Sequence, residues 1–392
     1  MNLSVPQPSL GLYIHIPFCR TKCIYCNFNT YARLEHLIPD YVRALSIELQ
    51  AWGHVLEHPA VRTIFLGGGT PSLLAERDIT QVITSACKAF DVSPAAEVTL
   101  EANPGDVTDA KLSSWKALGV NRLSMGVQSF DDAELKMLTR RHTAEQAKDA
   151  YRLMKAAGLP NVSFDLIYGL PMQSLETWRR TLEQSLQLDP VHISLYGLTV
   201  EEGTPLRHDV ESGRLPKPDP DIAADMYLMA EEMLKGYRHY EISNWAKPGY
   251  EAKHNLIYWH NEPFLGVGPG AHSYLRRKRF WNIKSPADYI RRLTTDTGAR
   301  WPFDEMPTVE EWRDVDPKDV ASETSILQLR LDEDLAISAV ASRYGEAEAW
   351  RQAGTLRDFA RHGLVTESNG LFRLTTKGRL LSNEVFVKLL PE

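Results

Sequence analysis

Short apolar, β-rich runs alternate with amphipathic stretches along roughly the first two hundred residues. The amphipathic stretches have helical spacing; in Asp40–Trp52, for example, apolar Tyr41, Leu45 and Leu49 fall on one face. Alternation of this kind predicts right-handed βαβ units and a parallel sheet. Six such units predict an α/β fold with a partial, open (β/α)6 barrel. The predicted strands are Leu12–Ile16, Arg62–Leu66, Glu97–Glu101, Asn121–Gly126, Val162–Ile167 and His192–Tyr196.

The pattern changes from about residue 300, where a charged stretch, Asp314–Glu323, is followed by helical segments and a hairpin. The hairpin is predicted from the Asn369-Gly370 pair between two short β-rich runs, since Asn-Gly favours a two-residue turn. This order predicts a smaller C-terminal α+β domain of winged-helix type. We therefore divide the chain into a barrel (1–240), a connecting segment (241–300) and a C-terminal domain (301–392). The predicted helices are Ser325–Leu331, Ala336–Tyr344, Glu348–His362 and Thr376–Leu390.

Composition is that of a soluble globular protein, with 43% hydrophobic and 24% charged residues in 392. No apolar run approaches the ~20 residues needed to span a bilayer, and Met1–Leu10 lacks the features of a signal peptide. A net charge of −7 speaks against general nucleic-acid binding. In the winged-helix-like region basic residues are mixed with acids, so a structural role is favoured over DNA binding there.

Three of the four cysteines, Cys19, Cys23 and Cys26, have the spacing C-x3-C-x2-C directly after the first predicted strand. Clustered cysteines indicate a metal site in a reducing compartment, so we expect a cytoplasmic location. Soft thiolates select zinc, copper(I) or an iron–sulfur cluster. A [4Fe–4S] cluster held by three cysteines leaves one iron open for a ligand. A partial zinc site, completed by His15 or by a partner chain, is the alternative.

The fourth cysteine, Cys87, falls on a predicted helix whose apolar residues recur at helical spacing. We expect it on the buried face, where a free cysteine behaves as a small hydrophobe. The apolar positions of this helix are Ile79, Val82, Ile83, Ala86 and Phe90.

The cysteine spacing resembles the signature of the radical S-adenosylmethionine (SAM) superfamily, in which the open iron takes the amino and carboxylate groups of SAM. One βα unit later, Phe65-Leu66-Gly67-Gly68-Gly69-Thr70-Pro71 matches the GGGTP segment of these enzymes. Glycines let a ligand approach the backbone closely. The resemblance implies a [4Fe–4S] cluster and SAM as cofactors, with Gly68, Gly69 and Thr70 contacting SAM.

Four further segments resemble the oxygen-independent coproporphyrinogen dehydrogenase (HemN) family and its relatives. They are Leu100–Pro104, Ser124–Phe130, Arg140–His142 and Asp165–Pro171. The family resemblance places Tyr13, Glu101, Gln128, Arg140 and Asp165 at SAM-contacting positions. It also implies that backbone near Gly197 and in the loop 266–272 lines the site. The two acids can accept hydrogen bonds from ribose hydroxyls or the amino group, and the arginine can pair with the SAM carboxylate.

Two features separate the chain from that dehydrogenase. Phe28 stands where the enzyme has the last cysteine of C-x3-C-x2-C-x-C, and only eighteen residues precede Cys19. The segment from His254 to Trp259 instead has the H-N-x-x-Y-W pattern of the HemW family of haem chaperones. With Tyr240–Trp245 and Gly266–Ser273, it makes the chain resemble that family over nearly its whole length.

The resemblance implies haem as a further cofactor and as cargo. His254 is the predicted haem ligand, because histidine is a common axial ligand and Tyr258 and Trp259 can cover the macrocycle. His260 is a second candidate for the haem ligand. The alternative to haem ligation is that His254 is a loop histidine that only bonds a backbone group.

The predicted function is therefore haem binding and delivery on a radical-SAM scaffold, without coproporphyrinogen dehydrogenase activity. The resemblance implies haem-accepting proteins, respiratory enzymes among them, as partners. It leaves open a homodimer and a peripheral association with the membrane. Two other functions compete with it: decarboxylation of coproporphyrinogen III by radical chemistry, and radical-SAM chemistry on another substrate. Phe28 and the His254–Trp259 segment favour the chaperone over the decarboxylation.

Overall fold

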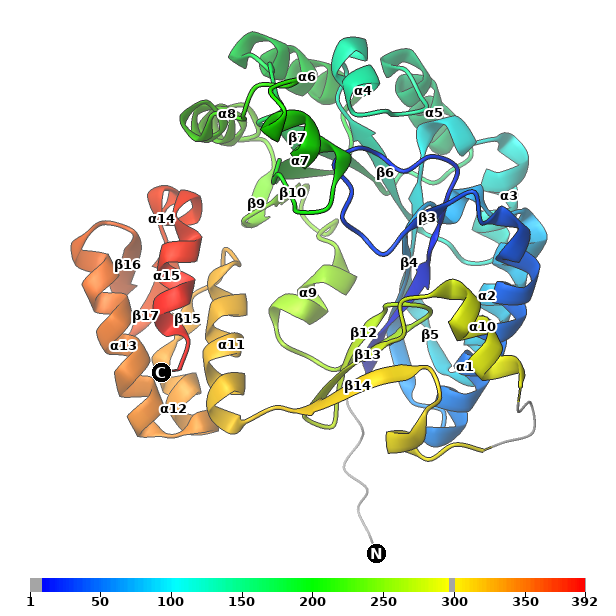
Figure 1. Cartoon of the computed structure of the whole chain (residues 1–392). Coiled ribbons are helices and arrows are strands. Elements are labelled where there is room, and N and C mark those ends of the chain that lie inside the picture. The colour runs from blue at the N-terminus through cyan, green and yellow to red at the C-terminus, as the bar shows by residue number, and fades with distance from the viewer. Residues whose placement is uncertain (1–8, 296–299, 392) are drawn as a thin grey trace, which may run out of the picture.

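The structure, a computed structural model that describes residues 9–295 and 300–391, is built on one large twisted sheet (Figure 1). Six neighbouring parallel strands follow the order of the chain and coincide with the six predicted strands, so the predicted α/β core is confirmed. Residues 1–8, part of the stretch whose sequence lacks signal-peptide features, lie outside the described residues. The six are β1 (Leu10–Ile16), β4 (Ala60–Gly68), β5 (Asp91–Ala102), β6 (Arg122–Gln128), β7 (Val162–Tyr168) and β8 (His192–Gly197).

The sheet continues beyond this core on both sides, which the sequence pattern did not reveal. β11 (Phe264–Val267) pairs in parallel with β1, and three antiparallel strands follow it: β12 (His272–Leu275), β13 (Lys278–Asn282) and β14 (Val309–Asp314). At the other end, β10 (Asn244–Ala246) and β9 (Arg238–Glu241) extend the sheet from β8. These strands have three to six residues, and three of them, β9, β13 and β14, carry charged residues, so their apolar periodicity is too weak to identify them.

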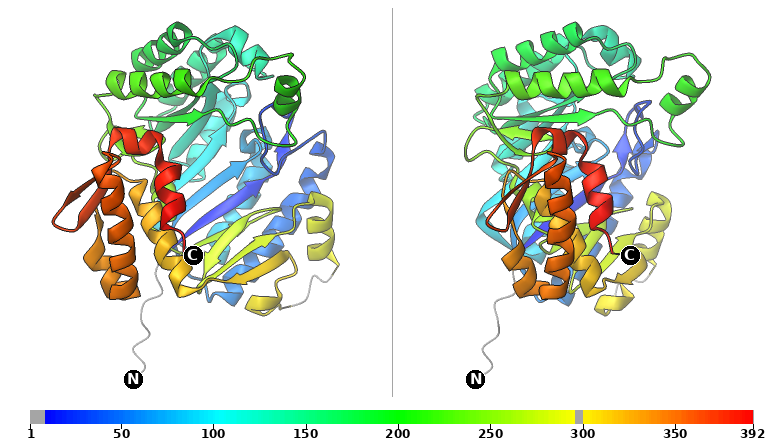
Figure 2. Two further views of the ribbon diagram at one scale, coloured as in Figure 1. Left: turned by 60° about the vertical axis from the view of Figure 1, so that its left-hand side comes forward. Right: turned by 90° about the vertical axis from the view of Figure 1, so that its left-hand side faces the viewer.

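Helices pack against the outer face of the parallel strands (Figure 2). Buried tryptophans anchor three of them, namely Trp52, Trp115 and Trp178. Capping boxes at Thr143 and Ser174 satisfy the free N–H groups that begin α5 and α6. The helices of this part of the chain are α1 (Ile38–Val55), α2 (Glu76–Ala89), α3 (Asp109–Ala117), α4 (Asp132–Met137), α5 (Ala144–Ala156), α6 (Leu175–Leu188), α7 (Pro205–Glu211), α8 (Pro220–Met233) and α10 (Pro286–Thr294). Of these, α7 lies beside the cysteine loop instead, where Leu206 N donates to Ile24 O at 2.9 Å. None of the described helices is long and apolar enough to cross a membrane.

The expected position of Cys87 was wrong. Helix α2 forms as predicted, with Ile79, Val82, Ile83 and Ala86 buried, but Cys87 is exposed. It follows Ala86 by one residue, which is about 100° around a helix, and so it lies off the buried stripe.

The C-terminal region forms a small α+β domain, as predicted. Its sheet has the order β15 (Leu335–Ala336), β17 (Leu371–Leu374) and β16 (Val365–Ser368). The predicted hairpin turn is confirmed by positive φ angles of 53° at Asn369 and 77° at Gly370. The predicted last helix is broken into two at Leu381, and the charged stretch begins a helix at Pro317. The helices are α11 (Pro317–Leu329), α12 (Ile337–Tyr344), α13 (Glu346–Arg361), α14 (Thr376–Leu380) and α15 (Ser382–Leu389).

Helix α9 (Lys253–Trp259), which carries the H-N-x-x-Y-W segment, packs against the parallel strands on the side toward the C-terminal domain (Figure 1). The Glu97 carboxylate of β5 accepts hydrogen bonds from the backbone N–H groups of Lys253 and His254, each at 3.1 Å. A carboxylate at a helix N-terminus is favourable. Gly11 of β1 makes room for this close approach, because a Cβ there would lie 2.8 Å from Ile257 Cδ1. The helix is thus fixed to the sheet by its first turn.

Candidate functional site

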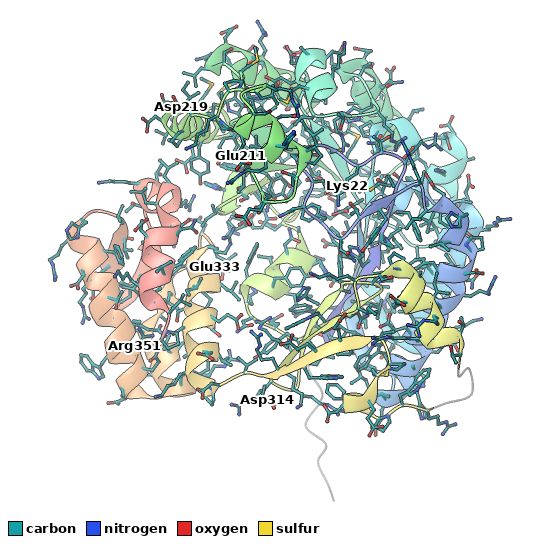
Figure 3. All side chains as sticks on the ribbon, in the orientation of Figure 1. Lys22, Glu211, Asp219, Asp314, Glu333 and Arg351 are labelled. Carbon is teal, nitrogen blue, oxygen red and sulfur yellow. The ribbon has the colours of Figure 1, made fainter. Side chains whose placement is uncertain are left out.

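A cavity of about 480 Å³ lies where the parallel strands end and their loops gather. Its wall contains all three clustered cysteines and most of the residues predicted to contact SAM. The cysteines come from the loop after β1, whose Lys22 is labelled in Figure 3. The predicted residues in this wall are Cys19, Cys23, Cys26, Phe28, Gly68, Gly69, Thr70, Glu101, Gln128, Arg140, Asp165 and Gly197.

The cysteine loop is held from behind by distant parts of the chain. Asn29 Nδ2 donates to the carbonyl oxygens of Pro269 at 2.9 Å and Lys284 at 3.0 Å. The Asn29 carbonyl is bonded to His15 Nε2 at 2.9 Å. The loop 266–272, expected to line the site, is not among the residues lining the cavity, and it contacts the cysteine loop through Pro269 instead. In this structure the loop 266–272 therefore holds the cysteine loop in place.

Each of the three cysteine sulfurs has at least one polar partner. Thr70 Oγ1 donates to Cys19 Sγ at 3.5 Å, and Arg140 Nη1 donates to Cys23 Sγ at 3.4 Å. Cys26 Sγ lies 3.7 Å from the Thr30 hydroxyl. Hydrogen bonds to sulfur stabilise thiolates and tune an iron–sulfur cluster.

The donor set fits a cluster to which each cysteine gives one thiolate. Burial raises the pKa of the Cys19 thiol, and the hydrogen bond from Thr70 opposes that rise. Within residues 9–295 and 300–391, no three His, Cys, Asp or Glu side chains are grouped closely enough to hold a single metal ion.

Gly68, the last residue of β4, and Gly69 line the cavity, but their lack of side chains serves packing first. A Cβ on Gly69 would lie 2.6 Å from the Phe18 carbonyl oxygen and 2.7 Å from that of Ile16. Gly68 has a φ of +109°, and a Cβ there would collide with the His15 ring. We expected these glycines to open the backbone to a ligand. The structure shows that they let β4 pass close to the start of the cysteine loop.

Two partly buried carboxylates line the cavity. Glu101 Oε2 accepts from the Gly68 N–H at 2.9 Å, and Asp165 Oδ2 accepts from Ser124 Oγ at 2.8 Å. Burial, with a further contribution from the charge of Asp165, raises the pKa of Glu101 to about 7. Burial also raises the pKa of Asp165. A ligand that donates hydrogen bonds or carries positive charge is favoured here.

We expect Glu101→Gln to remove a pH dependence of stability. The pKa of Glu101 is about 7 in the folded protein against an ordinary value of 4.5, so the folded state keeps a proton that the unfolded chain releases. The wild-type free energy of unfolding should therefore fall, relative to that of the variant, by about 3 kcal/mol as pH rises from 4.5 to 7. Urea denaturation at constant ionic strength measures both curves. If the wild type and Glu101→Gln show the same dependence of unfolding free energy on pH, the pKa of Glu101 is not raised. Glu384→Gln is the control, because Glu384 is exposed.

Arg140 and Gln128 contribute in ways that the sequence did not show. Arg140 is held by its bond to Cys23 and by a 2.7 Å bond from Nη2 to the Gly126 carbonyl, so it contacts one of the three predicted cluster ligands directly. Gln128 ends β6 with a φ of +69°, a left-handed conformation that is uncommon outside glycine and is often found at functional sites. Phe28 is 65% exposed at the cavity wall.

Tyr13 and His254 lie outside the main cavity, in the wall of a neighbouring chamber of about 180 Å³. The chamber also contains Tyr258 and Arg122. It adjoins the main cavity, since the two share four wall residues: Glu101, Ser124, Asp165 and Tyr196.

His254, the predicted haem ligand, has both ring nitrogens hydrogen-bonded in this structure. His254 is 1% exposed, with Nδ1 bonded to Thr63 Oγ1 at 2.8 Å and Nε2 to the Tyr258 hydroxyl at 2.7 Å. Burial and the Arg122 charge lower its pKa to about 3. The rival His260 is more accessible, with its Nε2 3.3 Å from Glu333 Oε2 of the C-terminal domain. Glu333 is labelled in Figure 3.

Sequence reasoning missed several residues that shape the site, among them Asn29, Arg122, Ser124 and Tyr196. For two of them the sequence held a signal, because side chains two apart on a strand lie on the same face. In β6 that face carries Arg122, Ser124, Gly126 and the predicted site residue Gln128. Asn29 carries no such signal, since its partners lie in loops 240 and 255 residues away.

Comparison with protein families identifies both parts of the chain. Residues 13–184 match the radical SAM superfamily, and residues 315–381 match the HemN C-terminal domain. Haem chaperones HemW from Mycobacterium tuberculosis and Escherichia coli are each 36% identical to this chain. The alignment with the M. tuberculosis protein covers 98% of this chain and 96% of that protein. The alignment with the E. coli protein covers 99% of this chain and 100% of that protein.

Among solved structures, the E. coli coproporphyrinogen III oxidase HemN, described as a radical SAM enzyme, superposes with a TM-score of 0.85. It is 24% identical, and the superposition covers 98% of this chain and 90% of that one. At that identity the likeness establishes the fold and not the reaction.

Proposed function

The chain belongs to the HemW family of haem chaperones within the radical SAM superfamily, and from this we propose that it binds haem and passes it to haem-requiring proteins. The observation that carries the proposal is 36% identity over nearly the full length to proteins of that name. The recipients belong to the same proposal, as does a cytoplasmic location.

The radical SAM family implies a [4Fe–4S] cluster and SAM, and the residues around the main cavity fit both. We assign Cys19, Cys23 and Cys26 to the cluster. Bound in this way, the cluster would supply an open iron to which SAM can coordinate.

The surrounding side chains have the chemistry that SAM requires. Glu101 and Asp165 offer buried oxygens to hydroxyl or amino donors, and Thr70 and Arg140 orient the thiolates. Phe28 gives the cysteine loop an exposed aromatic group next to the cluster position.

The second candidate function is decarboxylation of coproporphyrinogen III. The shared fold favours it, since HemN superposes over nearly the whole chain. Phe28 and the His254–Trp259 segment distinguish this chain from that enzyme in sequence. The fold and the predicted SAM site are common to both functions, so they do not discriminate.

One experiment tests the proposal directly. Haem is added to the purified, anaerobically reconstituted protein and its absorption spectrum is recorded, while conversion of coproporphyrinogen III is measured in parallel with SAM and a reductant. We expect a shifted Soret band at stoichiometric haem and no protoporphyrinogen IX. Steady product formation would replace the chaperone assignment by the dehydrogenase.

We expect His254→Ala to lower haem affinity by about tenfold or more, because an axial bond and the wall of the chamber are both lost. Ligation by His254 requires the Tyr258 hydroxyl to leave Nε2, and breaking one such bond costs only about 1 kcal/mol. Titration of haem, followed at the Soret band, measures the loss.

Two further measurements separate ligation from support of the fold. Free imidazole should restore the wild-type spectrum of His254→Ala, and His260→Ala should have the smaller effect. If imidazole restores nothing, His254 is not the ligand; if affinity is unchanged, haem binding does not depend on it at all.

A further inference from the structure

Residues 199–218, the strap, make up most of the connection between β8 and α8 and carry helix α7. In Figure 2 the strap projects from the barrel, with α7 at its outer end beside the cysteine loop. Thr199 and Glu201, at the base of the strap, belong to the wall of the main cavity. The strap therefore starts at the rim of the proposed SAM site.

The strap is anchored at its outer end by few contacts. Within the described residues, one hydrogen bond joins it to the rest of the chain, from Leu206 N to Ile24 O at 2.9 Å. Its other hydrogen bonds and its ion pairs lie inside the strap itself. Two of its residues are buried, Thr204 at 5% exposure and Leu206 at 0%. Segments with so few buried contacts open at a low cost in free energy.

The anchor joins the two ends of the parallel core. Ile24 lies in the cysteine loop after β1, whereas the strap follows β8, and these are the first and last of the six parallel strands. In the described part of the chain β1 and β8 are not neighbours in the sheet, so strand pairing does not close the barrel between them. Residues on both sides of Ile24 line the main cavity, as does the base of the strap. The bond from Leu206 to Ile24 thus completes the rim of the cavity on its open side.

The cysteine loop is held more firmly on its other side. There Asn29 Nδ2 donates to the carbonyl oxygens of Pro269 and Lys284, and the Asn29 carbonyl is bonded to the His15 ring. The strap side has a single backbone hydrogen bond by comparison. Of the two contacts, the one with the strap separates from the loop at the lower cost.

From these contacts we infer that the strap is a lid: it releases Ile24 to let SAM enter or leave the main cavity, and it closes on the cysteine loop over bound SAM. The inference rests on the proposed function, which assigns SAM to this cavity. Gly203 and Gly213 stand just before and just after α7, and a Cβ on either would meet no atom within 4 Å. The backbone on both sides of α7 is therefore free to turn as the lid opens.

Hydrogen exchange followed by mass spectrometry measures the opening. The reconstituted protein is exchanged under anaerobic conditions with and without SAM, and peptides of the strap are compared with peptides of β6 and β7. Without SAM, we expect the amides of the strap to exchange at least about tenfold faster than those of the strands. Saturating SAM should slow exchange in the strap by about tenfold and leave the strands unchanged, because bound ligand favours the closed lid.

Leu206→Ala tests the anchor. It removes the buried side chain but keeps the backbone N–H and a residue that favours the helix. Because the closed lid loses packing, the association and dissociation rate constants of SAM should each rise by about tenfold, with cluster content unchanged. Labelled SAM, chased with unlabelled SAM, gives the dissociation rate. Leu228→Ala is the matched control, since Leu228 is 42% exposed on α8, outside the strap.

The outcomes are distinct. If the strap exchanges as slowly as the strands, or if SAM binds without slowing exchange in the strap, the strap is a fixed wall and the lid is excluded, although the SAM site stands. Equal rate constants in Leu206→Ala and the wild type would exclude the lid as well. If the wild type does not bind SAM, the proposed site fails and this inference falls with it. The wild-type exchange experiment decides the question even if Leu206→Ala does not fold.

Discussion

Replacing Cys23 by serine is expected to abolish the [4Fe–4S] cluster and, with it, SAM binding. A serine hydroxyl is a poor substitute for a thiolate at iron, and the cavity wall holds no fourth cysteine to replace it. The Cys23 sulfur also accepts a hydrogen bond from Arg140 Nη1 at 3.4 Å, so the substitution disturbs the arginine as well. Iron and sulfide analysis after anaerobic reconstitution, together with equilibrium dialysis of SAM, measures both losses.

Cys87→Ser is the matched control, since Cys87 is exposed on α2 and does not line the cavity. Its cluster content should equal that of the wild type. A marked loss in Cys87→Ser, or a full cluster in Cys23→Ser, would require a different set of ligands. Stoichiometric zinc without a cluster in the wild type would replace the iron–sulfur assignment altogether.

Gly69→Ala should nearly eliminate both cluster and SAM binding, a larger effect than a single methyl group normally has. The new Cβ would overlap the carbonyl oxygens of Ile16 and Phe18, which are backbone atoms and cannot rotate away. Relief requires β4 and the start of the cysteine loop to separate. That breaks the bonds from Gly69 N to Ile16 O at 2.8 Å and from Thr70 N to Phe18 O at 2.9 Å. Overpacking of this kind typically costs about 1–3 kcal/mol.

Gly354→Ala provides the comparison, because a Cβ there meets nothing within 4 Å and Gly354 lies inside helix α13. Alanine should be neutral or stabilise that helix by roughly 0.5–1 kcal/mol. Thermal unfolding and cluster content are measured for both variants. If Gly69→Ala binds SAM and holds a cluster like the wild type, β4 and the cysteine loop are less tightly packed than the structure indicates.

The parallel core could be predicted because its signal is local. Each of the six strands is a short apolar run, and each intervening helix has its own apolar face, so periodicity identifies them one at a time. The hairpin at Asn369-Gly370 was equally readable, since turn chemistry depends on two residues. The strands that flank this core, β9 to β14, were missed because their pairing depends on neighbours already present in the sheet.

The exposed position of Cys87 shows the limit of periodicity within a single helix. An apolar stripe identifies the helix and its buried face, but a residue at the margin of the stripe can fall on either side of it. Only the packing of α2 against the sheet decided that Ala86 is buried and Cys87 is not.

By itself, the sequence determined the chemistry of the site: three thiolates on one loop, a glycine turn beside it and acids at the ends of strands. These follow from residue types and short spacings. The tertiary structure alone decided which of those groups are free to act. His254 is occupied because Thr63, 191 residues away, bonds its ring, and Asn29 holds the cysteine loop through a partner 240 residues away. Arg122, Glu101 and Asp165 come from three different strands and meet in the wall of one chamber. Hydrogen-bond partners brought together by folding leave no trace in local sequence, so only the folded chain reveals them.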